Sequence, residues 1–366
     1  MSRPKLYLEV DRKDPRRTRV VEEPDAALAA GHARLEIERV ALTANTATYA
    51  LLGDRLGYWD FYPCPAPWGR VPAIGWARVV ESAAPEVAAG GLYFGWFPMA
   101  SAIDLQVAPA PQGLIDTGAH RSEHAPIYRS FTLSERDPVY QPGADAEDRH
   151  ALLRAAFTTG MLIDAFFAGR SDCGARQIVV LSASSKTAIA FAHEAARRSA
   201  ATLVGLTSAR NLEFVRGLGC YAEVSTYEAI ESLAAQSSVI VDMAGNAALL
   251  DRVHGHLGDH IAHSMRVGAS HFGAQSAQPP SAGPAPELFF APTQSQAMLA
   301  ALGPEAFMAR MRAGLAAFVE HSAGWLELER SQGPAAMERV WQDTLAGRVS
   351  PATGQIVSLA SSPAPG

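Results

Sequence analysis

The hydrophobic pattern of the chain changes character near residue 148. The first 148 residues contain short apolar or alternating stretches between Gly- and Pro-rich segments, as expected for half-buried strands joined by turns. The clearest stretches span residues 32–42, 73–82 and 91–97. Many short strands separated by turn residues predict a barrel or a sandwich for this part of the chain.

From residue 150 onward the pattern alternates between strands and helices. Residues 150–169 have helical apolar spacing. Strands are then predicted at residues 177–182, 201–207, 220–224, 237–243 and 259–265, with helices at 186–199, 210–218, 227–235 and 246–257. This alternation predicts right-handed crossovers and a doubly wound parallel sheet of the nucleotide-binding type. A Pro/Gly/Ser-rich connector at 275–286, a helix at 294–322 and a strand–helix–strand segment at 325–359 follow.

Composition and charge narrow the class of protein. A chain of 366 residues with 48% hydrophobic residues has enough material for two domains with real cores. The net charge is -6 and no basic cluster is present, which argues against nucleic acid and anionic membranes as partners. Three scattered cysteines form neither a disulfide framework nor a zinc cluster, so a cytoplasmic protein is expected. Neither a signal peptide nor a membrane-spanning apolar run is expected.

The turn after the first strand of the doubly wound region has unusual residues for its position. A dinucleotide-binding turn normally carries glycines and presents the free N–H groups of a helix N-terminus to a pyrophosphate. Here the turn reads SASSKTA from residue 182 to 188. Ser182, Ser184, Ser185 and Thr187 are small polar residues suited to phosphate, and Lys186 adds positive charge. The alternative is that a serine merely caps the helix.

The end of the second strand lacks the acidic residue that usually holds the ribose 2′-hydroxyl of NAD. Ser208 and Arg210 stand there instead and suit a 2′-phosphate, which favours NADP(H) over NAD(H). The alternative is a solvated arginine in the first turn of a helix.

Five histidines between residues 254 and 271 invite a metal interpretation. They are His254, His256, His260, His263 and His271. A helix end, a turn and a strand would scatter these imidazoles over different faces, so no metal site is expected. Contact of His263 or His271 with a nicotinamide is a further alternative.

Several segments resemble the medium-chain dehydrogenase/reductase superfamily, and its zinc-free quinone oxidoreductase branch in particular. Residues 41–49 (ALTANTATY) followed by Gly53 resemble the segment "GVNPxDxY…G" of that branch, and VPAIGW at 71–76 resembles its "P-x-x-x-G" step. DMAG at 242–245, ending in Gly245, resembles the end of its fourth Rossmann strand, where cofactor is bound. The segments ALTANTATYALLGD, GYWDFYP, WGRVPAIGW and SASSKTA resemble more closely the domain of unknown function 2855 family, which implies a fold but no known reaction.

The resemblance implies a domain division. A Rossmann nucleotide-binding domain at residues 149–291 would be inserted in a β-rich GroES-like catalytic domain made of residues 1–148 and 292–366. It also implies a homodimer, since dimers are common in the superfamily.

The departures from the superfamily argue against zinc. Its zinc alcohol dehydrogenases carry a cysteine near the position of Asn45 and a Gly-His-Glu step, where this chain has Gly75-Trp76-Ala77. The clustered four-cysteine structural site is also missing, so no tetrahedral thiolate site is expected.

An aromatic-rich loop at residues 57–68 is the candidate substrate site. It holds five aromatic side chains in twelve positions, and in the resembling fold this region borders the substrate cleft. Aromatic walls suit a flat or apolar small molecule. Tyr49, Tyr58 or Tyr62 would donate a proton and Asn45 would hold a carbonyl oxygen. The alternative is that these aromatics only pack the core.

These features together predict an NADP(H)-dependent reductase of an activated alkene, quinone or carbonyl compound. One alternative is a non-catalytic or degenerate nucleotide-binding sensor, which the glycine-poor turn supports. Another is an accessory enzyme that acts on a carrier-tethered acyl chain.

Overall fold

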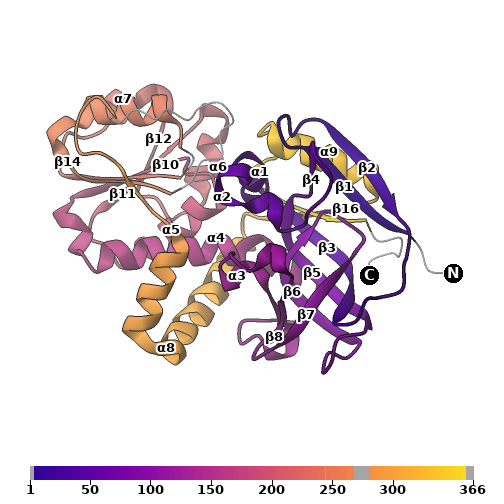
Figure 1. Ribbon diagram of the computed structural model, residues 1–366. Helices are drawn as coiled ribbons and strands as arrows, with labels where there is room; N and C mark the ends of the chain where they lie inside the picture. The colour runs from indigo at the N-terminus through magenta and orange to yellow at the C-terminus, as the bar shows by residue number, and fades with distance from the viewer. Residues whose placement is uncertain (1–3, 244, 268–279, 360–366) are drawn as a thin grey trace. The chain divides into compact units, whose positions relative to one another are not determined.

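The computed structural model describes residues 4–243, 245–267 and 280–359 (Figure 1). The chain divides into two compact units. The first comprises Met1–Leu152 with Glu327–Gly366, and the second comprises Leu153–Leu326. The first boundary falls inside the long helix α4 (Ala144–Ala168).

The first unit is rich in β-strands, as predicted. Its strands are β1 (Lys5–Asp11), β2 (Thr18–Glu23), β3 (His32–Leu42), β4 (Trp68–Gly69), β5 (Pro72–Ser82), β6 (Gly90–Pro98), β7 (Ala102–Ala110), β8 (Gly113–Asp116), β9 (Ser130–Leu133), β16 (Glu327–Gln332) and β17 (Thr353–Ser358). Its helices are α1 (Ala44–Leu51), α2 (Gly53–Leu56), α3 (Pro126–Arg129) and α9 (Pro334–Leu345), with the short 3-10 turns η1 (Tyr58–Asp60), η2 (Ala119–Arg121) and η3 (Ser134–Arg136).

The main sheet of this unit closes on itself. Its strand order is β16-β17-β3-β5-β6-β9-β8-β7, and β3 also pairs with β7. The second pairing of β3 joins the two ends of a six-strand run, which makes the barrel expected from the sequence. A small sheet, β2-β1-β4, adds to this unit.

Two glycines of the resembling motifs are required by close packing. A Cβ atom on Gly75 in β5 would lie 2.2 Å from the carbonyl oxygen of Arg39 in β3. A Cβ on Gly53 would lie 2.3 Å from the indole ring of Trp59. Real side chains do not approach so closely, so both positions exclude larger residues.

A buried carboxylate ties the start of α4 to the barrel. Asp148 is fully buried and accepts from Arg39 at 2.7 Å and from Arg330 at 2.6 Å. Two guanidinium groups on one buried carboxylate compensate for its desolvation. The pair of contacts fixes β3 and β16 against the same helix end.

The second unit has the Rossmann fold. Its strands are β10 (Gln177–Leu181), β11 (Thr202–Thr207), β12 (Glu223–Thr226), β13 (Ser238–Asp242), β14 (Ile261–Arg266) and β15 (Glu287–Leu288). Its helices are α5 (Lys186–Ala195), α6 (Leu212–Gly217), α7 (Ala247–Leu257) and α8 (Ala291–Ser322), with η4 (Ser171–Gly174), η5 (Ala209–Asn211), η6 (Tyr227–Ser232) and η7 (Gly258–His260). The parallel strands follow the order β12-β11-β10-β13-β14-β15, which is the dinucleotide-binding order 3-2-1-4-5-6.

Three features of this unit differ from the sequence-based expectation. Helix α8 belongs to the second compact unit and not to the β-rich one, because it packs on α5 and on Phe157 through Phe318. The helix also bends at Gly303 and Pro304, where Gly303 has a φ of 77°. Helix α4 is long and apolar enough to cross a membrane by composition alone, although no such run was expected; 67% of its apolar window is buried, as in a core helix.

Candidate functional site

The Rossmann sheet has its topological switch point between β10 and β13. These two strands run in parallel and pair from Gln177 with Ser238 to Leu181 with Asp242. Strand order reverses here, so the segments that follow both strands line one crevice at the carboxyl edge. The serine-rich turn (residues 182–187) follows β10, and Gly245 follows β13.

The serine-rich turn adopts a tight conformation without glycine. Ser182 has a φ of 58°, in the left-handed region that a side chain disfavours. The N–H of Ser185 donates to the carbonyl of Ser182 at 2.9 Å, and the N–H of Ala183 donates to Leu206 at 3.0 Å. The chain therefore makes the turn that glycine usually makes, at some conformational cost.

Ser185 has a capping role. Its hydroxyl oxygen accepts a hydrogen bond from the N–H of Ala188 at 3.3 Å, so it is the N-cap of α5. The alternative of capping is thus confirmed for this one serine. The hydroxyl proton of Ser185 is not consumed by this contact.

Other groups of the turn have N–H or hydroxyl donors that no described residue accepts. Across the described part of the chain, neither the N–H of Ser184 nor that of Thr187 has a hydrogen-bond acceptor. The hydroxyl of Ser184 accepts from the amide of Asn211 at 3.1 Å, which leaves its proton for another acceptor. Burial lowers the pKa of Lys186, the first residue of α5, to about 8.

Two tyrosines that flank β12 donate hydrogen bonds to the turn. Tyr221 donates to the carbonyl of Ala183 at 3.1 Å, and Tyr227 donates to the hydroxyl of Ser182 at 3.5 Å. Burial raises the pKa of both phenols, so they stay protonated donors at neutral pH. The sequence analysis did not identify either tyrosine, because each lies about 40 residues along the chain from the turn residue that it contacts.

The ends of β11 and β13 complete the crevice. The hydroxyl of Thr207 is buried and has no hydrogen-bond partner within the described residues. Ser208 is half-buried and Arg210 is exposed in η5. The N–H of Gly245, at a φ of 72°, donates to Asp242 at 3.0 Å, and Arg266 lies 3.9 Å from the same carboxylate.

These groups fit the phosphates and ribose of a dinucleotide. Two free N–H groups at the start of a ten-residue helix are donors of the kind that bind a pyrophosphate. The unpartnered hydroxyl of Thr207 is a buried polar group that a bound ribose would satisfy. The predicted cofactor residues from all three strand ends thus lie at one edge of the sheet.

In the first unit, two predicted catalytic residues share a short helix. The segment that carries Asn45 and Tyr49 folds as α1, so these residues are one turn apart on one face. Asn45 is half-buried, and its amide makes no hydrogen bond to any residue that the structure describes. Tyr49 is 9% exposed, and its hydroxyl accepts from Trp96 Nε1 at 3.1 Å.

Tyr58 and Tyr62 are also buried, and the hydroxyl of Tyr62 makes two hydrogen bonds within the protein. Tyr62 donates to the carbonyl of Trp96 and accepts from Arg121 at 3.3 Å. Burial raises the pKa of Tyr62 to about 12. Burial, and then the neighbouring Tyr128 hydroxyl, also raises the pKa of Tyr58.

The aromatic side chains form one cluster in which the predicted residues pack with others that the sequence did not reveal. Tyr58 packs edge-on against Tyr49 at 4.9 Å and against Tyr128 at 5.9 Å. Tyr128 in turn packs against Trp96 at 5.5 Å. Much of the aromatic-rich loop is therefore packing, as the alternative held, while Asn45 and Tyr49 keep unused donors.

Of the two positions that correspond to zinc ligands in the resembling alcohol dehydrogenases, that of Trp76 is engaged in other contacts here. Trp76 is fully buried, packs against Phe94 and His150, and donates from Nε1 to the carbonyl of Glu147 at 2.9 Å. Among the residues described, no group of three or more His, Cys, Asp or Glu side chains is arranged to hold a metal ion.

The histidine-rich segment scatters its rings, as expected. His254 contacts Ala282 and Ser264 at 2.8 and 2.9 Å, and His256 contacts the carbonyl of Leu233. His263 lies 3.6 Å from Glu287 at the far edge of the sheet. His260 is exposed in η7, and His271 lies outside the described residues.

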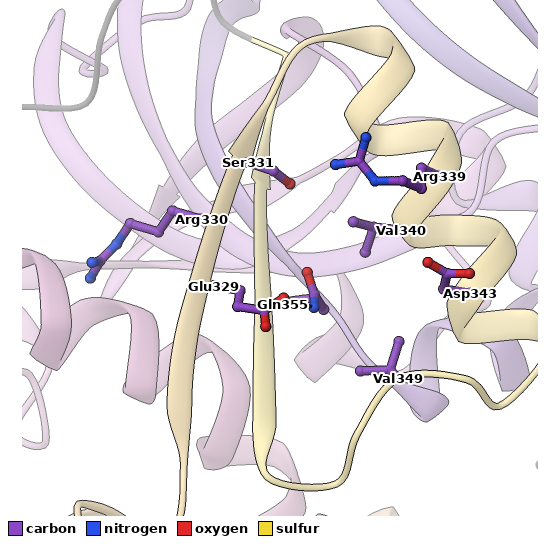
Figure 2. A pocket seen from close by; sticks show the side chains of 8 residues that line it. All are labelled: Glu329, Arg330, Ser331, Arg339, Val340, Asp343, Val349 and Gln355. Atoms are coloured by element: carbon purple, nitrogen blue, oxygen red, sulfur yellow. Dashed lines mark hydrogen bonds between the residues drawn. The ribbon is translucent and has the colours of Figure 1, made fainter.

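Two hollows occur within the units, and Tyr221 lines the second of them. One, of about 300 Å³, lies between α9 and the strands β16 and β17 (Figure 2). Its carboxylates are already engaged, since Asp343 pairs with Arg348 and Glu329 accepts from Gln355. The other, of about 490 Å³, lies along β11 and β12. No predicted site residue lines either hollow.

Comparison with known proteins agrees with this architecture. The family model "Protein of unknown function (DUF2855)" matches residues 40–350. No functionally curated protein matches the sequence.

Solved structures with the same fold align with nearly the whole chain. CurA from Vibrio vulnificus has 11% sequence identity and a TM-score of 0.58, over 98% of this chain and 100% of CurA. The Etr1p/NADP/crotonyl-CoA complex gives the same identity, TM-score and coverage. The yhdH oxidoreductase from Salmonella enterica in complex with NADP has 13% identity and a TM-score of 0.53, over 97% of this chain and 99% of that one. The chain thus has the fold of the medium-chain dehydrogenase/reductase superfamily, and because the matched segment covers most of its length, it belongs to the DUF2855 family.

Proposed function

We propose that this protein is an NADP(H)-dependent, zinc-free reductase of an activated alkene, quinone or carbonyl compound. The observation that carries the proposal is the serine-rich turn at the switch point of the Rossmann sheet. It presents the free N–H groups of Ser184 and Thr187 on the edge where dinucleotides bind in this fold, and Lys186 is the first residue of the helix that follows.

The preference for NADP(H) rests on the end of β11. Ser208 and Arg210 follow this strand, and no carboxylate stands there to hold a 2′-hydroxyl. A guanidinium forms strong charge-assisted hydrogen bonds with phosphate. Two of the similar structures are complexes with NADP, which supports the same choice.

The chemistry at the substrate is assigned to α1. Bound NADPH supplies the hydride. The free amide N–H of Asn45 would hold the substrate oxygen, and Tyr49 would give that oxygen its proton as charge develops there. A flat or apolar substrate suits the aromatic surroundings of Tyr49, and the complex of Etr1p with crotonyl-CoA supports a conjugated carbonyl compound.

The proposal is for a metal-free reaction. Asn45 and Trp76 stand in the places of zinc ligands, and an amide and an indole are poor ligands for zinc. The expectations of a cytoplasmic location and of a homodimer remain part of the proposal.

The test is a cofactor titration followed by a screen of acceptors. Calorimetry with NADPH and NADH would show binding, with NADPH tighter. A benzoquinone, cyclohexenone and crotonyl-CoA would then be offered, and loss of the reduced nicotinamide absorbance with one of them would support the proposal.

A second candidate function is a nucleotide-binding sensor without turnover. The strained Ser182 and the capping role of Ser185, in a turn without glycine, favour it. Such a protein would bind the dinucleotide and leave NADPH unoxidised with every acceptor.

A further inference from the structure

Trp96 in β6 contacts two of the candidate tyrosines through two different groups. Its indole Nε1 donates to the hydroxyl of Tyr49 at 3.1 Å. Its backbone carbonyl accepts from the hydroxyl of Tyr62. Because Trp96 is buried and packs edge-on against Tyr128 at 5.5 Å, its indole is held in place.

The two contacts have opposite consequences for the tyrosine protons. Tyr62 gives its proton to the carbonyl of Trp96, so that proton is used within the protein. Tyr49 receives a proton donor instead, and no acceptor for its own hydroxyl proton exists among residues 4–243, 245–267 and 280–359. Of the two, only Tyr49 is left with a proton to give.

The indole contact also favours loss of that proton. Burial raises the pKa of Tyr49, and the hydrogen bond from Trp96 acts in the opposite direction. A donor aimed at a phenol oxygen stabilises the negative charge that remains when the proton leaves. Trp96 keeps its own N–H throughout.

We propose that Trp96 is a positioning residue that fixes the Tyr49 hydroxyl and directs its proton toward the substrate oxygen. The inference rests on the proposed function. In the step, the O–H bond of Tyr49 breaks as an O–H bond forms on the substrate that has accepted the hydride. Solvent water later returns a proton to the Tyr49 phenolate.

The test is a double-mutant cycle with a matched control. Trp96→Phe removes the N–H and keeps an aromatic ring against Tyr128. We expect kcat to fall about tenfold, the size of one lost hydrogen bond, with KM for NADPH unchanged. In a Tyr49→Phe background, Trp96→Phe should cause no further loss, because the hydroxyl on which it acts is gone.

Trp341→Phe is the control. Trp341 is fully buried in the same unit and also donates from Nε1 to a carbonyl, that of Pro15, at 2.8 Å. It should lower stability without changing kcat. Losses that add in the double mutant, or an equal loss of kcat in Trp341→Phe, would overturn the assignment.

A readout without turnover separates this inference from the proposed function. In protein labelled with ¹³C at the tyrosine Cζ atoms, the Tyr49 signal is identified by its loss in Tyr49→Phe. It should shift in Trp96→Phe and stay in place in Trp341→Phe. If NADPH is never oxidised but the signal shifts, the positioning contact stands and the reductase proposal fails; an unmoved signal overturns the contact itself.

Discussion

Asn45 and Tyr49 lie one turn apart on the same face of α1, and both retain a hydrogen-bond donor that no described residue uses. Side chains four residues apart on a helix are neighbours, so an amide N–H and a phenol O–H can converge on one oxygen atom. Two donors that meet at a developing alkoxide or enolate form the kind of site that stabilises charge during reduction.

Removal of either donor should slow turnover without loosening the cofactor. We expect Tyr49→Phe to lower kcat about 10²-fold or more, as for loss of a general acid. Asn45→Ala should lower kcat/KM by a smaller factor, because an uncharged hydrogen bond is lost. Steady-state kinetics and an NADPH titration of each variant would check this. Tyr62→Phe is the comparison variant, since the hydroxyl proton of Tyr62 is already donated to the carbonyl of Trp96. If Tyr62→Phe lowers kcat as much as Tyr49→Phe does, the assignment of Tyr49 is contradicted.

Arg210 should discriminate between the two nicotinamide cofactors. Arg210→Ala should weaken NADPH by about 1.5–3 kcal/mol if a charge-assisted hydrogen bond to the 2′-phosphate is lost, and leave NADH nearly unchanged. Arg216→Ala, which removes another exposed arginine of the same region that pairs with Glu213, is the matched control. Equal affinity of the parent for both cofactors would count against the proposal.

Lys186 should make NADPH binding depend on pH. In the free protein its pKa is lowered to about 8 by burial, and a bound phosphate would raise that pKa again. NADPH affinity should therefore fall as the pH rises through 8, because binding must then take up a proton. In Lys186→Ala this dependence should vanish and binding should be weaker at neutral pH.

The lowered pKa of Lys186 also makes the stability of the protein depend on pH. Between pH 8 and the usual lysine value of 10.5, the folded protein holds fewer protons at Lys186 than the unfolded chain does. The free energy of unfolding should therefore rise with pH across this window through this group, and the rise should be absent in Lys186→Ala.

Ser185→Ala is the partner variant in the serine-rich turn. Loss of the N-cap hydrogen bond should lower the free energy of unfolding by about 1 kcal/mol. NADPH binding to this variant is therefore measured under conditions in which the variant is folded. If Ser185→Ala and Lys186→Ala both bind NADPH like the parent, or if the parent binds no dinucleotide, the turn is not the phosphate site.

We also expect no tightly bound zinc. Elemental analysis of the purified protein should show zinc far below one ion per chain, because Asn45 and Trp76 replace the usual ligands. A stoichiometric zinc signal that survives dialysis against a chelator would contradict this.

The sequence predicted the strands of the Rossmann sheet well, for a physical reason. Strands such as β10 and β13 are buried on both faces, so they read as continuous apolar runs. The short helix α1 was not predicted, because the β-branched threonines among its residues have low helix propensity. Its formation depends on packing, and it is this helix that brings Asn45 and Tyr49 together.

The sequence predicted only those parts of the candidate site whose residues lie close together along the chain. The serine-rich turn could be read because it sits between one strand and one helix. Trp96, Tyr128 and Tyr221 could not, because they reach the site residues across many positions of the chain and carry no motif. Likewise, the sequence did not separate α8 from the β-rich unit, since that choice depends on the packing of α8 against Phe157.

A single turnover with NADPH that carries deuterium at its transferable position tests most directly whether the protein is a reductase. Protein saturated with this cofactor is mixed with cyclohexenone or an aromatic aldehyde, in which the transferred deuterium is held on carbon and does not exchange with water, and the reduced product is examined by mass spectrometry. We expect deuterium in one product, oxidation of an equal amount of cofactor, and a slower reaction in Tyr49→Phe. Tight NADPH binding with no deuterium transfer to any acceptor would contradict the reductase and favour the sensor.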